Sequence, residues 1–444
     1  MSHNRRPLEH DIPDSERPAD HVSSENRASD SSALTLFGMS PEKGRWIFVA
    51  LGLAINMCLG GTYSWSVFRL PLQELWSIDA TASLLPFIFF FAVLMPLAGG
   101  PLDKYGPRPL TIIGGIIVGI GWILASQAPN ITFLVLAYGI IGGAGVGITY
   151  NATIGTSARW FPDRRGLAVG LTVLGVGVSP LITAPLGHYL IVNYGVLASF
   201  GIFGVAFLIL IVLLGLPLRF PPPDWRPEGW RPSQESLQCD DLNRSQMIRT
   251  RGFVGLWLGF FIGTLAGLMA VGISSPVAQE VFKLNAATAA ALVGVFAVFN
   301  GIGRPIFGYL ADRIHPRNAA MLSFVIIAAA AILLGFGAAP GATGVYIGGF
   351  CALWFCGGAW LAIAPACTAA FCGTTYYGAN YGLVFTAFGA GAIVGNLLAG
   401  QLRDLVGSYV AVFYPVAILA IAGIVISFFL IRAPSQAIVE GKGA

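Results

Sequence analysis

The sequence predicts an all-α membrane protein with twelve transmembrane helices arranged in two six-helix halves. The 444-residue chain is 55% hydrophobic and 10% charged, with a mean hydropathy of +0.74, whereas soluble domains carry about 25% charged residues. Apolar stretches of about 20 residues, each long enough to cross the hydrocarbon core, recur along the whole chain. A charged, glycine-containing motif also occurs twice, at equivalent places in the two halves.

The composition divides the chain into five segments. Residues 1–43 are polar, with mixed charges, Ser and Pro, which predicts a disordered cytoplasmic tail; they lack the apolar core of a signal peptide. Residues 219–252 are proline-rich and charged, which is typical of a linker loop outside the bilayer. The six-helix halves are then 44–218 and 253–432, and 433–444 is a second cytoplasmic tail.

The apolar stretches place six spans before the linker and six after it. The predicted spans are 44–68, 81–101, 109–127, 131–158, 166–192, 197–218, 253–276, 287–311, 318–338, 344–370, 380–401 and 408–431.

The distribution of Lys and Arg predicts the orientation. One set of loops contains Lys104, Arg108, Arg159, Arg164, Arg165, Arg313, Arg317 and six arginines of the linker. The loops on the opposite side contain Arg69, Lys283 and Arg403. Because basic loops stay in the cytoplasm, we expect both termini to be cytoplasmic, in a plasma membrane or a bacterial inner membrane.

The two halves contain related sequences. "GGPLDKYGPRP" begins at Gly99 and "GYLADRIHPRN" begins at Gly308. An offset of 209 residues aligns three pairs: Asp103 with Asp312, Pro96 with Pro305, and Arg108 with Arg317. Two halves related in this way place a transporter's substrate site near the membrane midplane, at their interface.

The repeated motif predicts a conformational gate at one end of the halves. Glycines allow close helix approach, and a carboxylate at a helix end can face another helix's N-terminus or an arginine. Arg159, at the end of the fourth span, is the candidate partner of Asp103. The expected gate comprises Gly99, Asp103, Arg108, Arg159, Gly308, Asp312 and Arg317.

Arg304 is the one basic residue deep within a span. It lies eight residues before Asp312, hence about 12 Å along the helix, and no Asp or Glu lies at such a depth. An arginine at a helix centre costs about 2.5–3.5 kcal/mol and usually marks a functional path. We expect it to hold a carboxylate through two parallel hydrogen bonds. In the alternative, it caps carbonyls freed around Pro305.

Several neighbouring side chains are candidate contacts of that anion. Asn300 lies one turn before Arg304 on the same helix face, where it either donates to the anion or bonds another helix. The aromatic candidates are Tyr63, Trp65, Tyr150, Trp354 and Trp360. Each is either a contact or packing; Tyr63 and Tyr150 are preferred because their hydroxyls need partners. His188 is interpreted as a packed or hydrogen-bonded residue, or as a proton relay.

The repeated motif resembles the signature loop of the major facilitator superfamily. Its Gly-x-x-x-Asp-x-x-Gly-x-Arg pattern is met by Gly99, Asp103, Gly106 and Arg108, and in the second copy by Gly308, Asp312 and Arg317 with His315 at the second glycine. The resemblance covers nearly everything after residue 44, and it implies the twelve-helix fold of that superfamily.

Arg304 preceded by Asn300, "YSW" on the first span and "NYG" at 380–382 resemble the oxalate/formate antiporter and monocarboxylate transporter families. The resemblance implies that Arg304 binds the substrate carboxylate and that Tyr63, Tyr150 and Trp360 line the cavity. Oxalate exchangers carry a lysine in span eleven, where this chain has Phe388 at or beside that position. One cation suits one carboxylate, which favours lactate, pyruvate or formate over oxalate.

We therefore expect a secondary transporter of small carboxylates that works by alternating access, with proton cotransport and counter-anion exchange both open. The alternatives are an oxalate/formate antiporter, a proton-coupled exporter of other small organic molecules, a sugar porter and a membrane sensor. The spans lack a catalytic triad, a carboxylate pair or a metal-spaced Cys and His set. We expect a monomer in the lipid bilayer, not an enzyme, with no cofactor, metal or nucleic-acid partner.

Overall fold

The computed structural model describes residues 35–77, 83–223, 225–230 and 241–432. The predicted tail 433–444 and most of the tail 1–43 lie outside these residues. Twelve helices in the described chain are long and apolar enough to cross a membrane, and the described residues contain no strand, so the predicted fold class is confirmed. The chain divides into two compact units, Met1–Gly44 and Arg45–Ala444; the first helix begins at Pro41, three residues before its predicted start.

The first half contains six spans, and three of them are interrupted helices. The first span is longer than predicted. It continues to Trp76 after a 3₁₀ helix that begins with two glycines. The elements are α2 (Pro41–Leu59), η2 (Gly60–Ser64), α3 (Trp65–Trp76), α4 (Leu84–Tyr105), α5 (Pro107–Ala125), α6 (Ile131–Leu134), η4 (Val135–Gly142), α7 (Gly143–Trp160), α8 (Arg165–Val178), α9 (Pro180–Tyr194) and α10 (Val196–Gly215).

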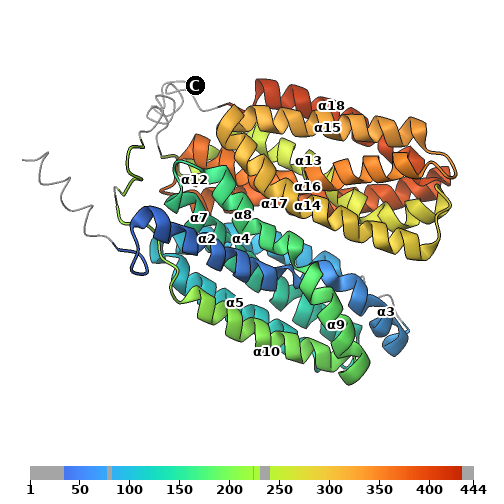
Figure 1. Cartoon of the computed structure of the whole chain (residues 1–444), viewed down its shortest axis with the longest axis horizontal. Helices are drawn as coiled ribbons and strands as arrows, with labels where there is room; N and C mark the ends of the chain where they lie inside the picture. The colour runs from blue at the N-terminus through green and yellow to red at the C-terminus, as the bar shows by residue number, and fades with distance from the viewer. Residues whose placement is uncertain (1–34, 78–82, 224, 231–240, 433–444) are drawn as a thin grey trace, which may run out of the picture. The chain divides into compact units, whose positions relative to one another are not determined.

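The second half follows a short helix in the linker. Within Arg45–Ala444, Figure 1 shows the helices of the first half, blue to green, on one side and those of the second half, yellow to red, on the other. The elements are α12 (Arg244–Met247), α13 (Arg251–Glu280), α14 (Ala286–Ile314), α15 (Pro316–Gly337), α16 (Thr343–Cys372), α17 (Tyr377–Val406), η5 (Tyr409–Val412) and α18 (Phe413–Phe429).

The repeated motif joins two consecutive helices through a single residue. Gly106, between α4 and α5, has φ 83° and ψ 176°, a conformation that favours glycine. His315, between α14 and α15, has φ 74° and ψ 139°. Its Nδ1 atom accepts a hydrogen bond from the Arg317 amide at 3.2 Å. The second copy therefore keeps the glycine's turn, with an imidazole that caps the following helix.

The two halves meet along two equivalent helix pairs, α4 with α17 and α8 with α14. Small residues make the approach possible: Gly99 lies against Gly378, and Gly308 lies against Gly166. A Cβ atom at Gly378 would lie 2.9 Å from the Gly99 carbonyl oxygen. Any larger side chain at these positions would push the helices apart.

The same pairing continues deeper into the bilayer. A Cβ atom at Gly382 would lie 2.7 Å from Pro96 Cα, and one at Gly170 would lie 2.9 Å from Pro305 Cα. Pro96 and Pro305 are one of the pairs aligned by the 209-residue offset. The repeat read from the sequence thus describes both contact surfaces between the halves. The end of these surfaces at Asp103, Asp312 and linker residues 241–250 is called the linker end below.

Candidate functional site

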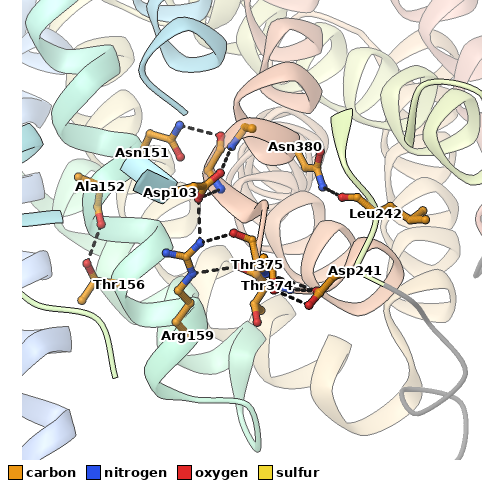
Figure 2. A network of polar contacts seen from close by, with 12 residues as sticks. Asp103, Asn151, Ala152, Thr156, Arg159, Asp241, Leu242, Thr374, Thr375 and Asn380 are labelled. Atoms are coloured by element: carbon orange, nitrogen blue, oxygen red, sulfur yellow. Dashed lines mark hydrogen bonds and ion pairs between the residues drawn. The ribbon is translucent and has the colours of Figure 1, made fainter. Parts of the chain in front are cut away.

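Asp103 ties α4 of the first half to α17 of the second (Figure 2). Its carboxylate accepts hydrogen bonds from the amides of Gly378 and Ala379, at 2.8 and 2.9 Å. It also forms an ion pair with Arg159 at 2.8 Å, in which both side chains are about nine-tenths buried. A carboxylate at a helix N-terminus is stabilised by the free amides and by the helix dipole. The arginine is the partner expected from the sequence.

Asp312 makes the equivalent contact in the opposite direction. Its carboxylate accepts hydrogen bonds from the Gly166 and Leu167 amides at the start of α8, at 2.7 and 2.8 Å. Each half therefore supplies one carboxylate that caps a helix of the other half. These two caps hold the linker end closed in this structure.

Two arginines of the first half bind backbone carbonyls at the C-terminal end of α16. Arg159 donates from Nε to the Thr374 carbonyl and from Nη2 to the Thr375 carbonyl, both at 2.9 Å, just beyond the end of α16. Arg165 donates to the Ala369 carbonyl in the last turn of α16 at 3.1 Å. Cations are stabilised at helix C-termini, so these bonds strengthen the closed linker end.

Asn151 adds a further contact between the halves. Its Nδ2 atom donates to the Met95 carbonyl of α4 and to the Gly378 carbonyl of α17, both at 3.0 Å. Sequence reasoning missed Asn151 and the inter-half role of Arg165, because neither belongs to the repeated motif. The only available signal for Asn151 was a polar amide inside an apolar span.

Two members of the predicted gate lie elsewhere. Arg108 is exposed in the first turn of α5. The guanidinium of Arg317 lies 5.8 Å from the Phe428 ring on α18. Among the described ion pairs, neither arginine reaches Asp103 or Asp312. The structure thus brings together Gly99, Asp103, Arg159, Gly308 and Asp312, and leaves the two motif arginines outside the contact.

Arg304 lies on α14, eight residues before Asp312, and its side chain is completely buried. Its Nη1 atom donates to the Val173 carbonyl of α8 in the other half, and its Nη2 atom donates to Asn300 Oδ1 at 2.9 Å. The carbonyl that it binds belongs to the opposite half, so the alternative of a cap around Pro305 is wrong. In the described chain, no carboxylate pairs with this guanidinium.

Both the oxygen and the nitrogen of the Asn300 side-chain amide form hydrogen bonds within the protein. Its Oδ1 atom accepts from Arg304, while its Nδ2 atom donates to the Trp354 carbonyl of α16 at 3.0 Å. The helix–helix alternative is therefore what the structure shows for its donor. Its acceptor holds the guanidinium in place. Asn300 orients Arg304, and one of the two N–H donors of its amide is used by the Trp354 carbonyl.

Tyr63, Tyr150 and Phe388 lie on the other sides of this region. The Tyr63 ring centroid is 6.0 Å from Arg304 Cζ. The Tyr150 hydroxyl is in electrostatic range of both Arg304 and Tyr63. The Tyr150 ring packs at 5.5 Å from Phe385, which in turn stacks on Phe388 at 4.8 Å. An aromatic cluster of α7 and α17 therefore extends from Tyr150 to Phe388.

Trp360 is not part of this region, contrary to the expectation. Its fully buried ring lies 5.1 Å from Phe324 of α15 and 6.2 Å from Phe260 of α13. Gly263 of α13 leaves the space for that ring. The tryptophan therefore packs the interior of the second half, behind Phe260.

Three other candidates also have structural or peripheral positions. Trp65 stacks on Tyr138 at 4.6 Å inside the first half, and the Trp354 ring packs 6.0 Å from Phe296. His188 is exposed on α9, so the interpretation as a packed residue is wrong.

Tyr381 is a residue that the sequence reasoning did not single out. It is completely buried on α17, stacked on Tyr377 at 5.8 Å, and its hydroxyl has no hydrogen-bond partner. Its ring lies 5.9 Å from that of Phe385, a member of the aromatic cluster that begins at Tyr150. The Nε–H group of Arg304 is also buried without a partner. Both unpartnered groups can donate, so an acceptor would satisfy them.

The described chain has twelve helices able to span a membrane, in two repeated halves. The halves are in contact at one end, and a buried arginine lies between them. This is the architecture of a transporter. A model of the Major Facilitator Superfamily matches residues 46–378. The match covers most of the chain, so the protein belongs to this superfamily of multi-pass membrane transporters.

Curated relatives and a solved structure narrow the comparison. The oxalate:formate antiporter of Oxalobacter formigenes is 30% identical over 367 residues, covering 82% of this chain and 86% of that protein. Monocarboxylate transporter 13 of Rattus norvegicus is 28% identical over 330 residues, covering 74% of each. The transporter FucP in its outward conformation superposes with a TM-score of 0.69 at 16% identity, covering 87% of this chain and 99% of FucP, which shows a common fold.

The capping geometry predicts unequal effects of the two motif carboxylates. Asp103→Asn removes the charge that holds both the α17 N-terminus and Arg159, whereas Asp312→Asn weakens the cap on α8 without breaking a direct ion pair among those described. We expect Asp103→Asn to raise the population open at the linker end by about tenfold, and more than Asp312→Asn does. The measurement is the distance between spin labels at Lys104 and Arg313, which are exposed at the ends of α4 and α14.

Asp404→Asn is the matched control for charge removal, because Asp404 is 75% exposed and contacts Arg403 of its own helix. Its distance distribution should equal that of the native chain. A folded Asp103→Asn variant with the native distribution would show that this carboxylate does not hold the linker end.

Proposed function

We propose that this protein transports small monocarboxylates, such as lactate, pyruvate or formate, across the membrane by alternating access. The observation that carries the proposal is Arg304: a completely buried cation, between two halves of a transporter, without a carboxylate beside it in the described chain. The names of two relatives, an oxalate:formate antiporter and a monocarboxylate transporter, support the same substrate class.

The chemistry of the region favours an anion over a neutral or cationic substrate. The guanidinium now has two neutral oxygen partners, the Val173 carbonyl and the Asn300 amide. A buried charge is stabilised far better by an opposite charge. A carboxylate can accept from two guanidinium nitrogens, and the free Nε–H of Arg304 and the free Tyr381 hydroxyl offer two donors.

Alternating access fits the contacts between the halves. Arg304 bonds the carbonyl of Val173 across the interface, so this partner is lost when the halves separate. An anion that enters at that moment replaces the carbonyl. If the linker end is cytoplasmic, as the basic loops predict, this structure is closed toward the cytoplasm. Coupling remains a choice between proton cotransport and counter-anion exchange.

Arg304→Lys tests the proposal directly. Lysine keeps the charge but loses the planar fork, so we expect uptake of formate, lactate and pyruvate to fall by about tenfold to a hundredfold. The assay is uptake into proteoliposomes, with and without a pH gradient and with internal counter-anions, which also distinguishes the two couplings. Arg251→Lys, at an exposed position at the start of α13, is the control. Undiminished uptake of every carboxylate by Arg304→Lys would refute the proposal.

Tyr381→Phe tests the second donor. The substitution keeps the ring and its stacking on Tyr377 and removes only the hydroxyl. We expect a rise of about tenfold in KM for a monocarboxylate, because one bond to a charged acceptor is lost. Tyr346→Phe is the matched control: it is a buried tyrosine whose hydroxyl bonds the Ser274 carbonyl inside the second half, so its KM should stay native. Equal KM values in both variants would remove Tyr381 from the site.

Phe388→Lys tests why a monocarboxylate is favoured. Phe388 lies among Phe385, Phe91 and Phe260, so that side of the region is apolar, and a second carboxylate would be unpaired there. A lysine should raise the uptake of oxalate relative to formate by tenfold or more. Phe388→Met keeps the apolar character and should preserve the native ratio. A folded lysine variant that keeps the native ratio would show that Phe388 does not set the charge preference.

A further inference from the structure

The ordered part of the linker lies beside the closed contact between the halves and bonds with residues of both halves. Figure 2 shows Asp241 and Leu242 beside the segment between α16 and α17, next to the Asp103–Arg159 pair. The short helix α12 follows directly, closed by a capping box between Asn243 and Gln246. This ordered part of the linker, Asp241–Met247, is called the strap below.

Five hydrogen bonds fasten Asp241 and Leu242 of the strap to the second half. The Asp241 carboxylate accepts from the Thr374 amide at 2.9 Å and from the Thr375 amide and hydroxyl. Leu242 donates to the Cys372 carbonyl at 3.2 Å and accepts from Asn380 Nδ2 at 2.7 Å. These partners are the last residue of α16, the loop after it and the first turn of α17. The strap is thus part of the second half.

One side chain of the strap reaches the first half. Arg244 donates from Nη2 to the Pro96 carbonyl of α4, and to the Ala379 carbonyl of α17 at 3.3 Å. Pro96 lies on the face of α4 that packs against α17, one turn from Gly99. A single guanidinium therefore bridges the two helices whose separation would open the linker end.

The strap also supports the ion pair beside it. Thr374 and Thr375 offer their amides to Asp241 and their carbonyls to Arg159. The peptide segment is thus held between an acid of the linker and a base of the first half. Asp241 fixes the acceptors of Arg159 in position, so the strap and the Asp103–Arg159 ion pair form one connected network.

We propose that the strap is a built-in clamp of the closed linker end, and that Arg244 is the residue that clamps it. The strap moves with the second half through the transport cycle, and the Arg244 bond to the Pro96 carbonyl breaks each time the linker end opens. The clamp biases the protein toward the state closed at this end, independently of which substrate is carried. A linker of this kind sets a conformational equilibrium in addition to connecting the two halves.

The test measures that equilibrium without substrate. Spin labels are attached at Lys104 and Arg313 in a chain whose six native cysteines are replaced and whose thermal unfolding matches the native protein. Arg244→Ala is expected to raise the long-distance population about tenfold, the effect of losing one charge-assisted bond. Arg244→Lys, which keeps the charge but loses the planar guanidinium, should give a smaller rise. Arg249→Ala, an exposed arginine of the same linker, should give none.

Asp241→Asn provides the second arm, because it loosens the strap from the second half without touching α4. It should also raise the open population, and the double variant should rise by clearly less than the product of the two single effects, because both substitutions disable the strap and only the positioning of the Arg159 acceptors is affected separately. A folded Arg244→Ala variant with the native distribution overturns the proposal. Effects of the two substitutions that multiply also overturn it, since they would then act separately. The readout uses no substrate, so it stands apart from the carboxylate proposal.

Discussion

The structure depends on one constraint: inside a membrane, each charge and each free backbone group must find its partner within the protein. At the linker end the partners come from opposite halves. Asp103 and Asp312 cap helices α17 and α8 across the interface, and Arg159 and Arg165 bind the end of α16. Glycines at the same contacts bring the backbones close enough for the short side chains to reach. The hydrogen bonds that satisfy these polar groups are therefore the same bonds that hold the two halves together at this end.

At the middle of the interface, the two halves carry different residues at equivalent positions. The repeat that aligns the gate places Met95 and Phe91 at the positions equivalent to Arg304 and Asn300, since 304 − 209 = 95 and 300 − 209 = 91. Phe91 packs against Phe385 and Phe388 at 4.9 and 5.9 Å. The second half thus contributes the polar pair together with Phe385 and Phe388, and the first half contributes Phe91 and Tyr150 to the same aromatic cluster. The symmetry is kept where the halves must close and is broken where a ligand with one charged and one apolar end would bind.

The sequence predicted those features that hydropathy and a motif encode. Span limits agree within a few residues over most of the chain, because a helix that crosses lipid is apolar along its whole length. The partner of Asp103 and the depth of Arg304 followed from the repeated motif. The orientation of Trp360 did not, since α16 is apolar on all sides and its sequence carries no periodic signal for the buried face.

The contacts of the linker could not be predicted from its sequence either, for a physical reason. Its composition predicts a loop outside the bilayer, and nothing in Asp241 or Arg244 marks them as residues that bond α4 and α17. Their contacts are with backbone carbonyls and amides, which every sequence provides. Asn300 shows the same limit: an amide on the face of Arg304 was predicted, but the sequence did not indicate that its oxygen accepts from Arg304 and its nitrogen donates to the Trp354 carbonyl.

Two rigid helices connect the gate with the proposed anion site. On α14, Arg304 and Asp312 are eight residues apart, so the residue proposed to bind the anion and the carboxylate that caps α8 belong to one helix. On α17, Gly378 and Ala379 hold Asp103, while Tyr381, Phe385 and Phe388 follow on the next turns. An anion that replaces the Val173 carbonyl at Arg304 removes one bond between α14 and α8. The cation proposed to bind the ligand is thus also a contact between the halves, so in this proposal ligand binding and closure compete for the same hydrogen-bond donors.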